Sequence, residues 1–366
     1  MGYPLLNIDL DKIEHNARVI VGLCAANGIE VSGVTKAVCG HPEVAGAMLR
    51  GGVTGLGDSR IENIRRLRAA GVEIPIMQLR LPSLSRTDEI IGCADISLNS
   101  EFQTLQALSA AALRLGRMHD VILMVDLGDL REGVSPNQVI GLAKASMELQ
   151  SIKLVGIGTN LACFGGLMPT RANMQRLEKL GAEVERACAI DLEWISGINS
   201  SGLKLLAEGG LPGRINHARI GEAILLGRET TQRERWPDTY QDAFVLQAEV
   251  IELGNKPSAF NGEHCEDAFG GHPHFKNHGV ILHALVNIGR QDVAVDGIEA
   301  LEPVTVIGAS SDYLGLDVSQ LAGRIKLGDS LSFTLNYSAL LAAMTSAYVE
   351  KRCIRGSLFD DQTLYA

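Results

Sequence analysis

The sequence predicts an α/β fold in which a (β/α)8 barrel is followed by an antiparallel β domain. Two observations predict the barrel: eight short apolar runs lie between residues 30 and 220, and stretches with helical periodicity follow most of them. A change of composition after Gly227 predicts the second domain. With 366 residues, of which 46% are hydrophobic, the chain can bury a large core.

The expected barrel strands are short and apolar, as parallel strands buried on both faces should be. In chain order they are residues 30–34, 53–57, 74–78, 94–98, 121–126, 153–159, 193–197 and 217–220. Helical periodicity marks 59–70, 100–117 and 171–189, with Ser59 and Ser100 as expected N-caps. A doubly wound open sheet is the alternative, but the even strand count and the lack of a GxGxxG sequence after the first strand favour a barrel.

The second domain begins where the composition changes. Residues 229–240 are polar and charged, and they precede runs such as AFVLQAEVIEL and GVILHALVNIG that Gly, Asn, Asp and Pro separate. This pattern predicts antiparallel strands joined by short turns. We therefore expect a barrel domain over residues 10–228 and a β domain made of residues 1–9 and 229–366. The early sequence LLNIDL is expected to pair into the β domain as an extra strand.

Composition and charge also indicate the class of partner and the cellular compartment. The net charge is −10 without a basic stripe, so we expect a small-molecule partner rather than nucleic acid. No apolar run approaches membrane-spanning length and the first residues do not resemble a signal peptide, so we expect a cytoplasmic protein. Seven cysteines with no CxxC pair and no metal-type spacing predict free thiols rather than disulfides or a zinc site.

One lysine stands out as a candidate for chemistry. The stretch VSGVTKAVCGH, residues 31–41, places Lys36 at the carboxyl end of the first expected barrel strand. Parallel α/β folds build their active sites at this edge. Burial would lower the pKa of this lysine and make it available for Schiff-base chemistry, whereas most lysines after strands are simply solvated.

Two later strand ends carry groups that would accompany such a lysine. The sequence GINSSG, residues 197–202, turns from the seventh strand into a helix. Its backbone amides and hydroxyls could bind a phosphate, although a serine N-cap would give the same pattern. Arg219 lies within the eighth strand, where its charge must find a partner.

Taken in order, these residues resemble the alanine racemase fold family of pyridoxal-phosphate enzymes. The resemblance spans residues 4–348 and rests on VTKAVCGH, VDLGDLREGV, the Thr159-Asn160 pair, NSSG, ARIG, GRQD, SSDYLGLDVS, LGDSL and NYSALL. Within the family the chain is most similar to the ornithine racemases, through VDLGDLREG, ADISLNSE, DAFG and GASSD. No single motif is decisive, but nine in the family's order make a strong match.

The resemblance implies pyridoxal 5'-phosphate as the cofactor and a role for each matching residue. Lys36 would hold the cofactor and act as the base on one face of the substrate Cα. Arg219 would face the pyridine nitrogen and leave it unprotonated, because a guanidinium does not give up its proton. Arg131 would contact the substrate carboxylate, with the backbone of Ser311, next to Asp312, as a second contact. The groups implied around the cofactor are Asn160, Ser200, Ser201, the backbone of Gly221 and Glu222, and Tyr337.

Three departures from the family's pattern bear on substrate and mechanism. The segment Gly289-Arg290-Gln291-Asp292 stands where the family has GYADG, so the tyrosine that serves the second face of the substrate is missing. Met124 stands at the lysine that is carbamylated in many alanine racemases, so Arg131 must be oriented by another group. Gly40 and His41 replace a further tyrosine. The loss of bulky aromatic side chains leaves room for a substrate longer than alanine.

We therefore predict a pyridoxal-phosphate-dependent racemase, an isomerase, that acts on a basic amino acid such as ornithine or lysine. The resemblance further implies a head-to-tail homodimer. Because the family's tyrosine is absent, we expect Asp292 to donate the proton on the face opposite Lys36, with Asp312 and Cys163 as alternatives.

A diamino acid also needs a carboxylate for its second ammonium group. The candidates are Asp129, Glu222, Glu266, Asp267 and Asp292.

Two other functions stay open at the level of sequence. A lyase of the same fold, such as a D-amino-acid aldolase or dehydratase, would need a metal site. His264, Cys265, His272 and His274 form the available cluster, although their spacing matches no familiar zinc pattern. A non-catalytic carrier of the cofactor is the other alternative, and the long β domain argues against it.

Overall fold

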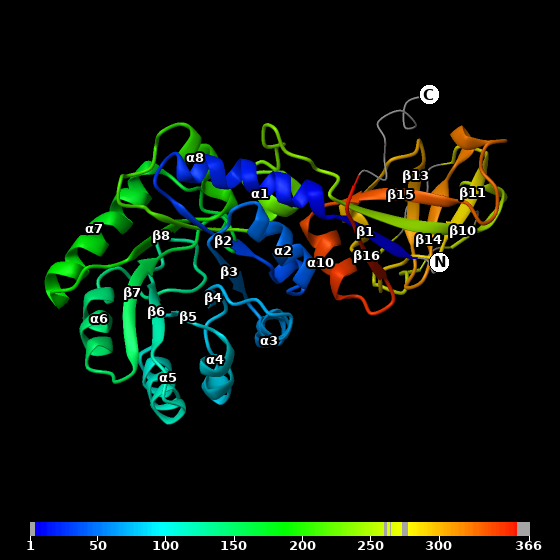
Figure 1. Cartoon of the computed structure of the whole chain (residues 1–366). Helices are drawn as coiled ribbons and strands as arrows, with labels where there is room; N and C mark the ends of the chain where they lie inside the picture. Colours follow the sequence, from blue (N-terminus) through cyan, green and yellow to red (C-terminus); the bar gives the residue numbers. More distant parts are fainter. Residues whose placement is uncertain (1–3, 260–261, 264, 273–276, 357–366) are drawn as a thin grey trace. The chain divides into compact units, whose positions relative to one another are not determined.

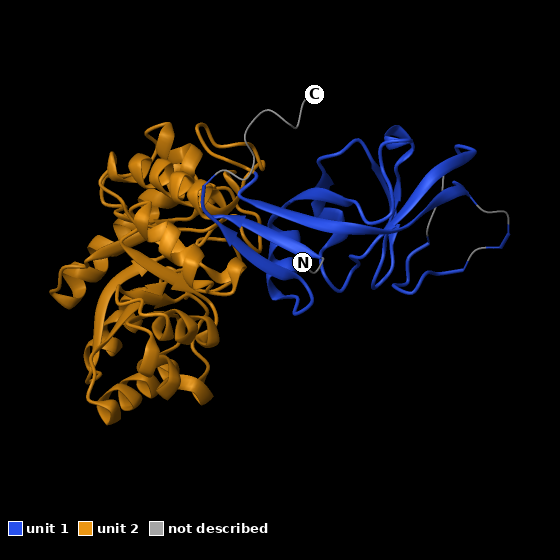
Figure 2. Cartoon of the chain, turned by 45° about the vertical axis from the view of Figure 1, so that its right-hand side comes forward, with its two compact units in different colours: residues 1–9, 242–366 blue, residues 10–241 orange. Residues whose placement is uncertain are grey.

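The computed structural model describes residues 4–259, 262–263, 265–272 and 277–356. The chain forms two compact units, Leu10–Gln241 and the combination of Met1–Asp9 with Asp242–Ala366 (Figure 2). We call them the barrel unit and the β unit.

The barrel unit contains a closed barrel of eight parallel strands, which confirms the predicted fold class (Figure 1). Around the barrel the strands are β2 (Glu30–Val34), β3 (Gly55–Asp58), β4 (Ile76–Gln78), β5 (Ile96–Asn99), β6 (His119–Met124), β7 (Ile152–Gly158), β8 (Trp194–Ile198) and β9 (His217–Ile220). Each predicted strand overlaps one of them, because strands buried on both faces are apolar along their whole length. The barrel closes where β9 pairs with β2 and Arg219 lies opposite Ser32.

Helices lie around the barrel (Figure 1). They are α1 (Leu10–Ala25), α2 (Pro42–Arg50), α3 (Ile61–Ala69), α4 (Thr87–Cys93), α5 (Phe102–Leu115), α6 (Val139–Met147), α7 (Arg171–Cys188), α8 (Leu203–Ala207) and α9 (Glu222–Leu226). The short 3-10 helices of the barrel unit are η1 (Lys36–Val38), η2 (Leu84–Arg86) and η3 (Ser200–Gly202), and those of the β unit are η4 (Val295–Gly297) and η5 (Ser319–Leu321). Across the part of the chain that the structure describes, no helix has the length and apolar character needed to cross a membrane.

The helix starts correct two predicted N-caps. The caps of α3 and α5 are Arg60 and Glu101 rather than Ser59 and Ser100, and neither side chain makes a capping hydrogen bond. At α3 the carboxylate of Asp58 accepts the backbone N–H of Arg60 at 2.9 Å, so the preceding strand supplies the acceptor that a serine would have provided.

Polar side chains are buried where β2, β8 and β9 meet. The imidazole of His217 shares hydrogen bonds with the hydroxyls of Ser32 (2.9 Å) and Ser196 (2.7 Å). Burial lowers the pKa of His217 to about 3, so the ring is neutral at physiological pH. The neighbouring strands carry instead an apolar cluster made of Met77, Ile96, Leu98, Ile122, Met124 and Val155.

The β unit contains a mainly antiparallel sheet, as predicted. Its strands are β1 (Leu5–Asp9), β10 (Phe244–Pro257), β11 (Val280–Val286), β12 (Ile298–Ala300), β13 (Thr305–Ala309), β14 (Leu314–Asp317), β15 (Ser330–Leu335) and β16 (Glu350–Ile354), and its helix is α10 (Tyr337–Thr345). Strand β1 pairs antiparallel with β10 and parallel with β16, which confirms the predicted extra strand. The seven cysteines are present as thiols and not as disulfides.

The boundary between the units falls after Gln241 and not after residue 228, as the composition had suggested. The polar segment between these positions is bonded within the barrel unit. The side chain of Asn16, in α1, donates to the carbonyls of Ile224 (3.1 Å) and Tyr240 (2.8 Å), and it accepts the backbone N–H of Tyr240 at 2.8 Å. Charged side chains of the segment also bind the barrel: Lys204 donates to Glu234 at 2.6 Å, and Arg233 donates to Glu222. The new unit starts only after this segment.

We expect Asn16→Ala to destabilise the barrel unit by about 2–4 kcal/mol, because it leaves one buried and two part-buried backbone groups without their partner. Both tryptophans, Trp194 and Trp236, lie in the barrel unit, so urea unfolding followed by tryptophan fluorescence reports on this unit alone. Asn27→Ala is the control, since the Asn27 side chain bonds one exposed carbonyl on the same helix. Equal midpoints for the two variants would contradict the expectation.

Candidate active site

Lys36 lies two residues after the end of β2 and begins η1 at the carboxyl end of the barrel. The turn that carries it is anchored on both sides. The hydroxyl of Thr35 donates to Asp58 Oδ2 at 2.7 Å, and Asn63 Nδ2 donates to the other oxygen of Asp58 at 2.9 Å. Gly40 has a φ of +59°, and a Cβ there would lie 2.8 Å from Asn63 Cβ, so only glycine fits this position without displacing α3.

Lys36 is half-buried, and its amine has no hydrogen-bonding partner among the described residues. Burial lowers the pKa of Lys36, the charges of Cys163 and Glu132 oppose this shift, and the charge of Arg131 adds to it. A lysine in this environment loses its proton more readily than a solvated one. This is what the role predicted for Lys36 requires.

The loop after β6, residues 125–134, has a shape set by its own backbone. Asp126 Oδ1 accepts the N–H groups of Gly128 (2.8 Å) and Leu130 (3.3 Å). At Gly133 the φ is +127°, and a Cβ there would lie 2.4 Å from the backbone nitrogen of Asp126. The backbone at residue 133 passes so close to Asp126 that no side chain fits there, which explains the glycine in the sequence LREGV.

Asp129 ties this loop to the one after β7. The side chain is almost wholly buried, and its oxygens accept the backbone N–H groups of Cys163 (3.3 Å) and Phe164 (2.9 Å). A Cβ at Gly165 would lie 2.6 Å from the carbonyl oxygen of Asp129. The carboxylate is therefore a structural clamp, and it is not placed to receive the second ammonium of a substrate.

The clamp brings together three polar side chains. Arg131 donates from Nε and Nη2 to the carboxylate of Glu132, and from Nη1 to Cys163 Sγ at 2.8 Å. The Glu132 side chain is 11% exposed and that of Arg131 is 31% exposed. Sequence reasoning named Arg131 and Cys163 but missed Glu132, because a glutamate beside an arginine in a polar loop normally faces solvent.

Arg219 projects from β9 into a set of oxygen acceptors. Nη1 donates to the carbonyl of Ser196 at 3.2 Å and to its hydroxyl, and Nη2 donates to the carbonyl of Thr159 at 2.7 Å. Burial lowers the pKa of Arg219 to about 10, with Glu132 raising and Arg131 lowering it. The guanidinium stays charged at neutral pH, and the same two neighbours act on Arg219 and on Lys36.

The turn after β8 forms the predicted group of small polar residues. Asn199, rather than a serine, is the N-cap of η3: its Oδ1 accepts the N–H (2.7 Å) and the hydroxyl (2.6 Å) of Ser201. Ser200 Oγ accepts the backbone N–H of Ala223 at 3.1 Å and so links this turn to α9. Asn160, after β7, accepts a hydrogen bond from Asn199 at 3.3 Å, and its own Nδ2 is buried without an acceptor among the described residues.

Two further predicted cofactor contacts lie at the start of α9. Gly221 is its N-cap, and a Cβ there would lie 3.1 Å from Val34 Cβ, on the strand that leads to Lys36. Glu222 follows, and its carboxylate is paired with Arg233. The structure thus places Gly221 beside the end of β2.

The remaining predicted site residues lie in the β unit. Asp292 is buried, and its carboxylate accepts the N–H of Gly289 at 3.0 Å and the hydroxyl of Ser346 at 3.4 Å, so it closes its own turn. Asp312 is exposed and accepts hydrogen bonds from Gln291 (2.8 Å) and from the adjacent serine hydroxyl. Tyr337 is half-buried at the start of α10.

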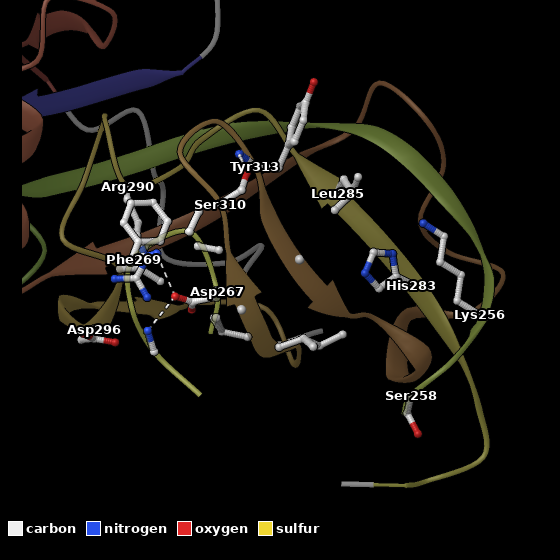
Figure 3. A pocket seen from close by; sticks show the side chains of 18 of the residues that line it. Lys256, Ser258, Asp267, Phe269, His283, Leu285, Arg290, Asp296, Ser310 and Tyr313 are labelled. Carbon is white, nitrogen blue, oxygen red and sulfur yellow. Dashed lines mark hydrogen bonds between the residues drawn. The ribbon is translucent and has the colours of Figure 1, made fainter. Parts of the chain in front are cut away.

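A cavity of about 950 Å³ lies in the β unit (Figure 3). Arg290, at the place of the family's second-face tyrosine, stacks its guanidinium 4.9 Å from the ring centre of Phe269. The carboxylate of Asp267 accepts the backbone N–H groups of Phe269 and Gly271, each at 2.8 Å, as the dashed lines in Figure 3 show. Nδ1 of His283 is buried in the lining without a partner among the described residues.

The histidine cluster considered for a metal is only partly described. His264 and His274 lie outside the described residues. Cys265 is exposed, and His272 lies 3.8 Å from the carboxylate of Glu266, a candidate for the second ammonium.

Comparison with known proteins gives the family. Residues 8–229 match the family described as "Alanine racemase, N-terminal domain". The chain is 37% identical over 354 residues to the ornithine racemase of Acetoanaerobium sticklandii, covering 96% of this chain and 100% of that protein. It is 38% identical over 352 residues to the lysine racemase of Thermotoga maritima, covering 96% and 98%.

The chain belongs to the alanine racemase family. This membership confirms the predicted family and the predicted class of enzyme, an amino-acid racemase. A solved relative agrees in architecture: the alanine racemase of a D-cycloserine-producing Streptomyces lavendulae superposes on this family member with a TM-score of 0.76, covering 98% of both chains at 20% identity.

We expect Lys36→Met to stabilise the cofactor-free protein at neutral pH, because it removes an amine whose charged form burial disfavours. Between the lowered folded-state pKa of Lys36 and its ordinary value of 10.5, the unfolded chain binds the proton more tightly than the folded chain does. The fold of the unsubstituted protein therefore gains stability as pH rises through this window.

The advantage of Lys36→Met should accordingly shrink as pH rises toward 10.5. Urea unfolding at several pH values between 7 and 10 measures it, with Lys153→Met as the control because that lysine is exposed. A stability difference that does not change with pH would show that the lysine's titration is not coupled to folding.

Proposed function

We propose that this family member is a pyridoxal-phosphate-dependent racemase of a basic amino acid, ornithine or lysine. The observation that carries the proposal is the gathering of Lys36, Arg131 and Arg219 around Glu132 at the carboxyl end of one barrel. The substrate class is supported by likeness over nearly the whole chain to an ornithine racemase and a lysine racemase.

The donor and acceptor groups of the barrel unit fit pyridoxal phosphate. Lys36 offers an amine that makes no hydrogen bond within the described chain, and Asn160 offers a buried N–H donor that lacks an acceptor. Arg219 offers a cation that keeps its proton, and the turn after β8 offers the hydroxyl of Ser200, whose oxygen accepts from Ala223 and whose O–H can donate. When bound, the cofactor would supply the electron sink that stabilises negative charge on the substrate Cα.

The chain's own residues have separate tasks in this proposal. Lys36, with its lowered pKa, takes up or returns the proton of the substrate Cα on one face. Arg131 binds the substrate carboxylate. Arg219 stays protonated and donates no proton during the reaction, because its pKa of about 10 remains well above neutrality.

We also propose a head-to-tail homodimer in which the β unit of one copy covers the barrel of the other. Large apolar side chains are exposed on the β unit: Phe269 is 51% and Tyr313 is 48% exposed, and both line the cavity of Figure 3. Exposed aromatic residues that gather at one cavity are typical of a surface that a partner covers. The residues implied at Asp292, Asp312 and Tyr337 would then serve a shared site.

The activity is tested on protein loaded with pyridoxal phosphate. In deuterated water, L-ornithine and L-lysine should exchange the α-proton and yield the D-isomers, at least about tenfold faster than alanine, because a desolvated second ammonium binds a carboxylate that alanine cannot use. Borohydride treatment followed by digestion should leave the label on Lys36. Lys36→Ala should lose racemisation, whereas the exposed Lys153→Ala should keep it. Equal or better turnover of alanine would contradict the substrate, and no α-exchange with any amino acid would contradict the activity.

The proton donor on the second face is tested with single variants. We expect Asp292→Asn to abolish racemisation while the α-proton of one enantiomer still exchanges with deuterated solvent through Lys36. Because Asp292 also closes a turn, the circular dichroism and thermal midpoint of the variant must match those of Asp312→Asn. Undiminished racemisation would assign the donor to Asp312 or Cys163, which Asp312→Asn and Cys163→Ser distinguish.

A further inference from the structure

The hydrogen bonds of Arg131 account for most of its donors. A guanidinium has five N–H groups in a fixed plane. Glu132 takes two of them, on Nε and Nη2, and Cys163 takes one, on Nη1. Two remain, one on each terminal nitrogen, and neither has an acceptor among the described residues. Nη1 and Nη2 share one edge of the guanidinium, and a carboxylate at that edge can accept from both nitrogens.

Glu132 is held where it can orient this guanidinium. Its side chain is more deeply buried than that of its partner, and the backbone around it is constrained by Gly133 and by the Asp129 clamp. A bidentate contact fixes both the position and the plane of an arginine, whereas a contact to one nitrogen leaves the plane free to rotate. Met124, at the end of the adjacent strand, is buried and apolar and cannot do this.

The charges at this end of the barrel also favour a positioning role for Glu132. Lys36, Arg131 and Arg219 are three cations whose fields overlap, and Glu132 is the carboxylate that acts on all three. Asp58 also acts on Lys36, but its oxygens are occupied by Thr35, Asn63 and backbone N–H groups. Removing the charge of Glu132 would leave a cluster of like charges with one orienting anion fewer.

We propose that Glu132 is the positioning residue of Arg131: it fixes the guanidinium so that the remaining N–H groups on Nη1 and Nη2 receive the substrate carboxylate, with Cys163 as the second support. The inference rests on the proposed function, since it assigns the site at which the amino acid's carboxylate binds. Glu132 acts through Arg131 and does not itself touch the substrate.

Two probes separate carboxylate binding from the rest of substrate recognition. 5-Aminopentanoate is ornithine without its α-amino group, and 1,4-diaminobutane is ornithine without its carboxylate. Their inhibition constants are measured on the cofactor-loaded enzyme with ornithine as substrate. For Glu132→Gln we expect the constant for 5-aminopentanoate to rise about tenfold or more, the size expected for misplacing a charge-assisted bidentate contact. The constant for 1,4-diaminobutane should stay within about twofold, because that probe has no carboxylate for Arg131 to bind.

The kinetic constants for ornithine should also show a loss of carboxylate binding in Glu132→Gln. The KM for ornithine should rise with the constant for 5-aminopentanoate, and kcat should fall less, because the carboxylate contact persists from ground state to transition state. Glu148→Gln is the matched control: it makes the same change at an exposed glutamate after α6. Cofactor absorbance and thermal midpoint are compared across the set.

A double-variant cycle tests whether Glu132 acts through Arg131. In an Arg131→Ala background, Glu132→Gln should raise the constant for 5-aminopentanoate by no more than about twofold further, because there is no guanidinium left to orient. Additive effects would mean that Glu132 binds the probe independently and would overturn the assignment. If Glu132→Gln does not fold, Glu132→Asp replaces it, since its shorter carboxylate should also misplace the guanidinium and raise the same constant.

The outcomes distinguish this inference from the proposed function. An unsubstituted protein that racemises no amino acid defeats the proposed function. An unsubstituted protein that racemises ornithine, together with a Glu132→Gln variant that behaves like Glu148→Gln toward both probes, overturns only the assignment of Glu132.

Discussion

The carboxylate of Asp129 is the interaction on which the carboxyl end of the barrel depends. By accepting two backbone N–H groups from the neighbouring loop, it holds the segments after β6 and β7 against each other. Arg131 and Cys163 lie on those two segments and meet because of it. A buried carboxylate with satisfied acceptors stabilises such a junction at little cost, whereas a solvated loop pair would let the guanidinium move.

Much of the fold could be predicted because its signals are local. The apolar runs of the barrel strands and the turn residues of the β unit are visible in short windows of sequence, and all eight barrel strands follow from them. The composition changes at residue 228, whereas the compact barrel unit continues to Gln241, because charged side chains of the intervening segment bind the barrel: Glu234 accepts from Lys204 and Arg233 donates to Glu222. Local composition does not distinguish a polar segment that binds the barrel from one at a domain junction.

The site residues that could be predicted from the sequence are likewise those with a local signal. Lys36, Arg131 and Arg219 could be named because each stands at a strand end or in a motif that resembles the family. Glu132 and Asp58 could not, because their importance comes from which donors they meet in space. Asp292 could be named from its position as a proton donor, but its contact with Gly289 could not. Its carboxylate accepts the N–H of Gly289 and so closes a turn, which sequence spacing alone does not reveal.

Burial lowers the pKa of both Lys36 and Arg219, but it leaves the two side chains with different protonation behaviour at neutral pH. Desolvation is the largest influence on both, and it lowers the pKa of each because it disfavours the charged form. Arginine starts from 12.5, so Arg219 falls only to about 10 and remains a cation at neutral pH. Lysine starts from 10.5 and moves toward the range in which a base can exchange protons. One desolvated barrel end can therefore hold both a fixed positive charge and a titrating base, and the charge of Glu132 raises the pKa of each.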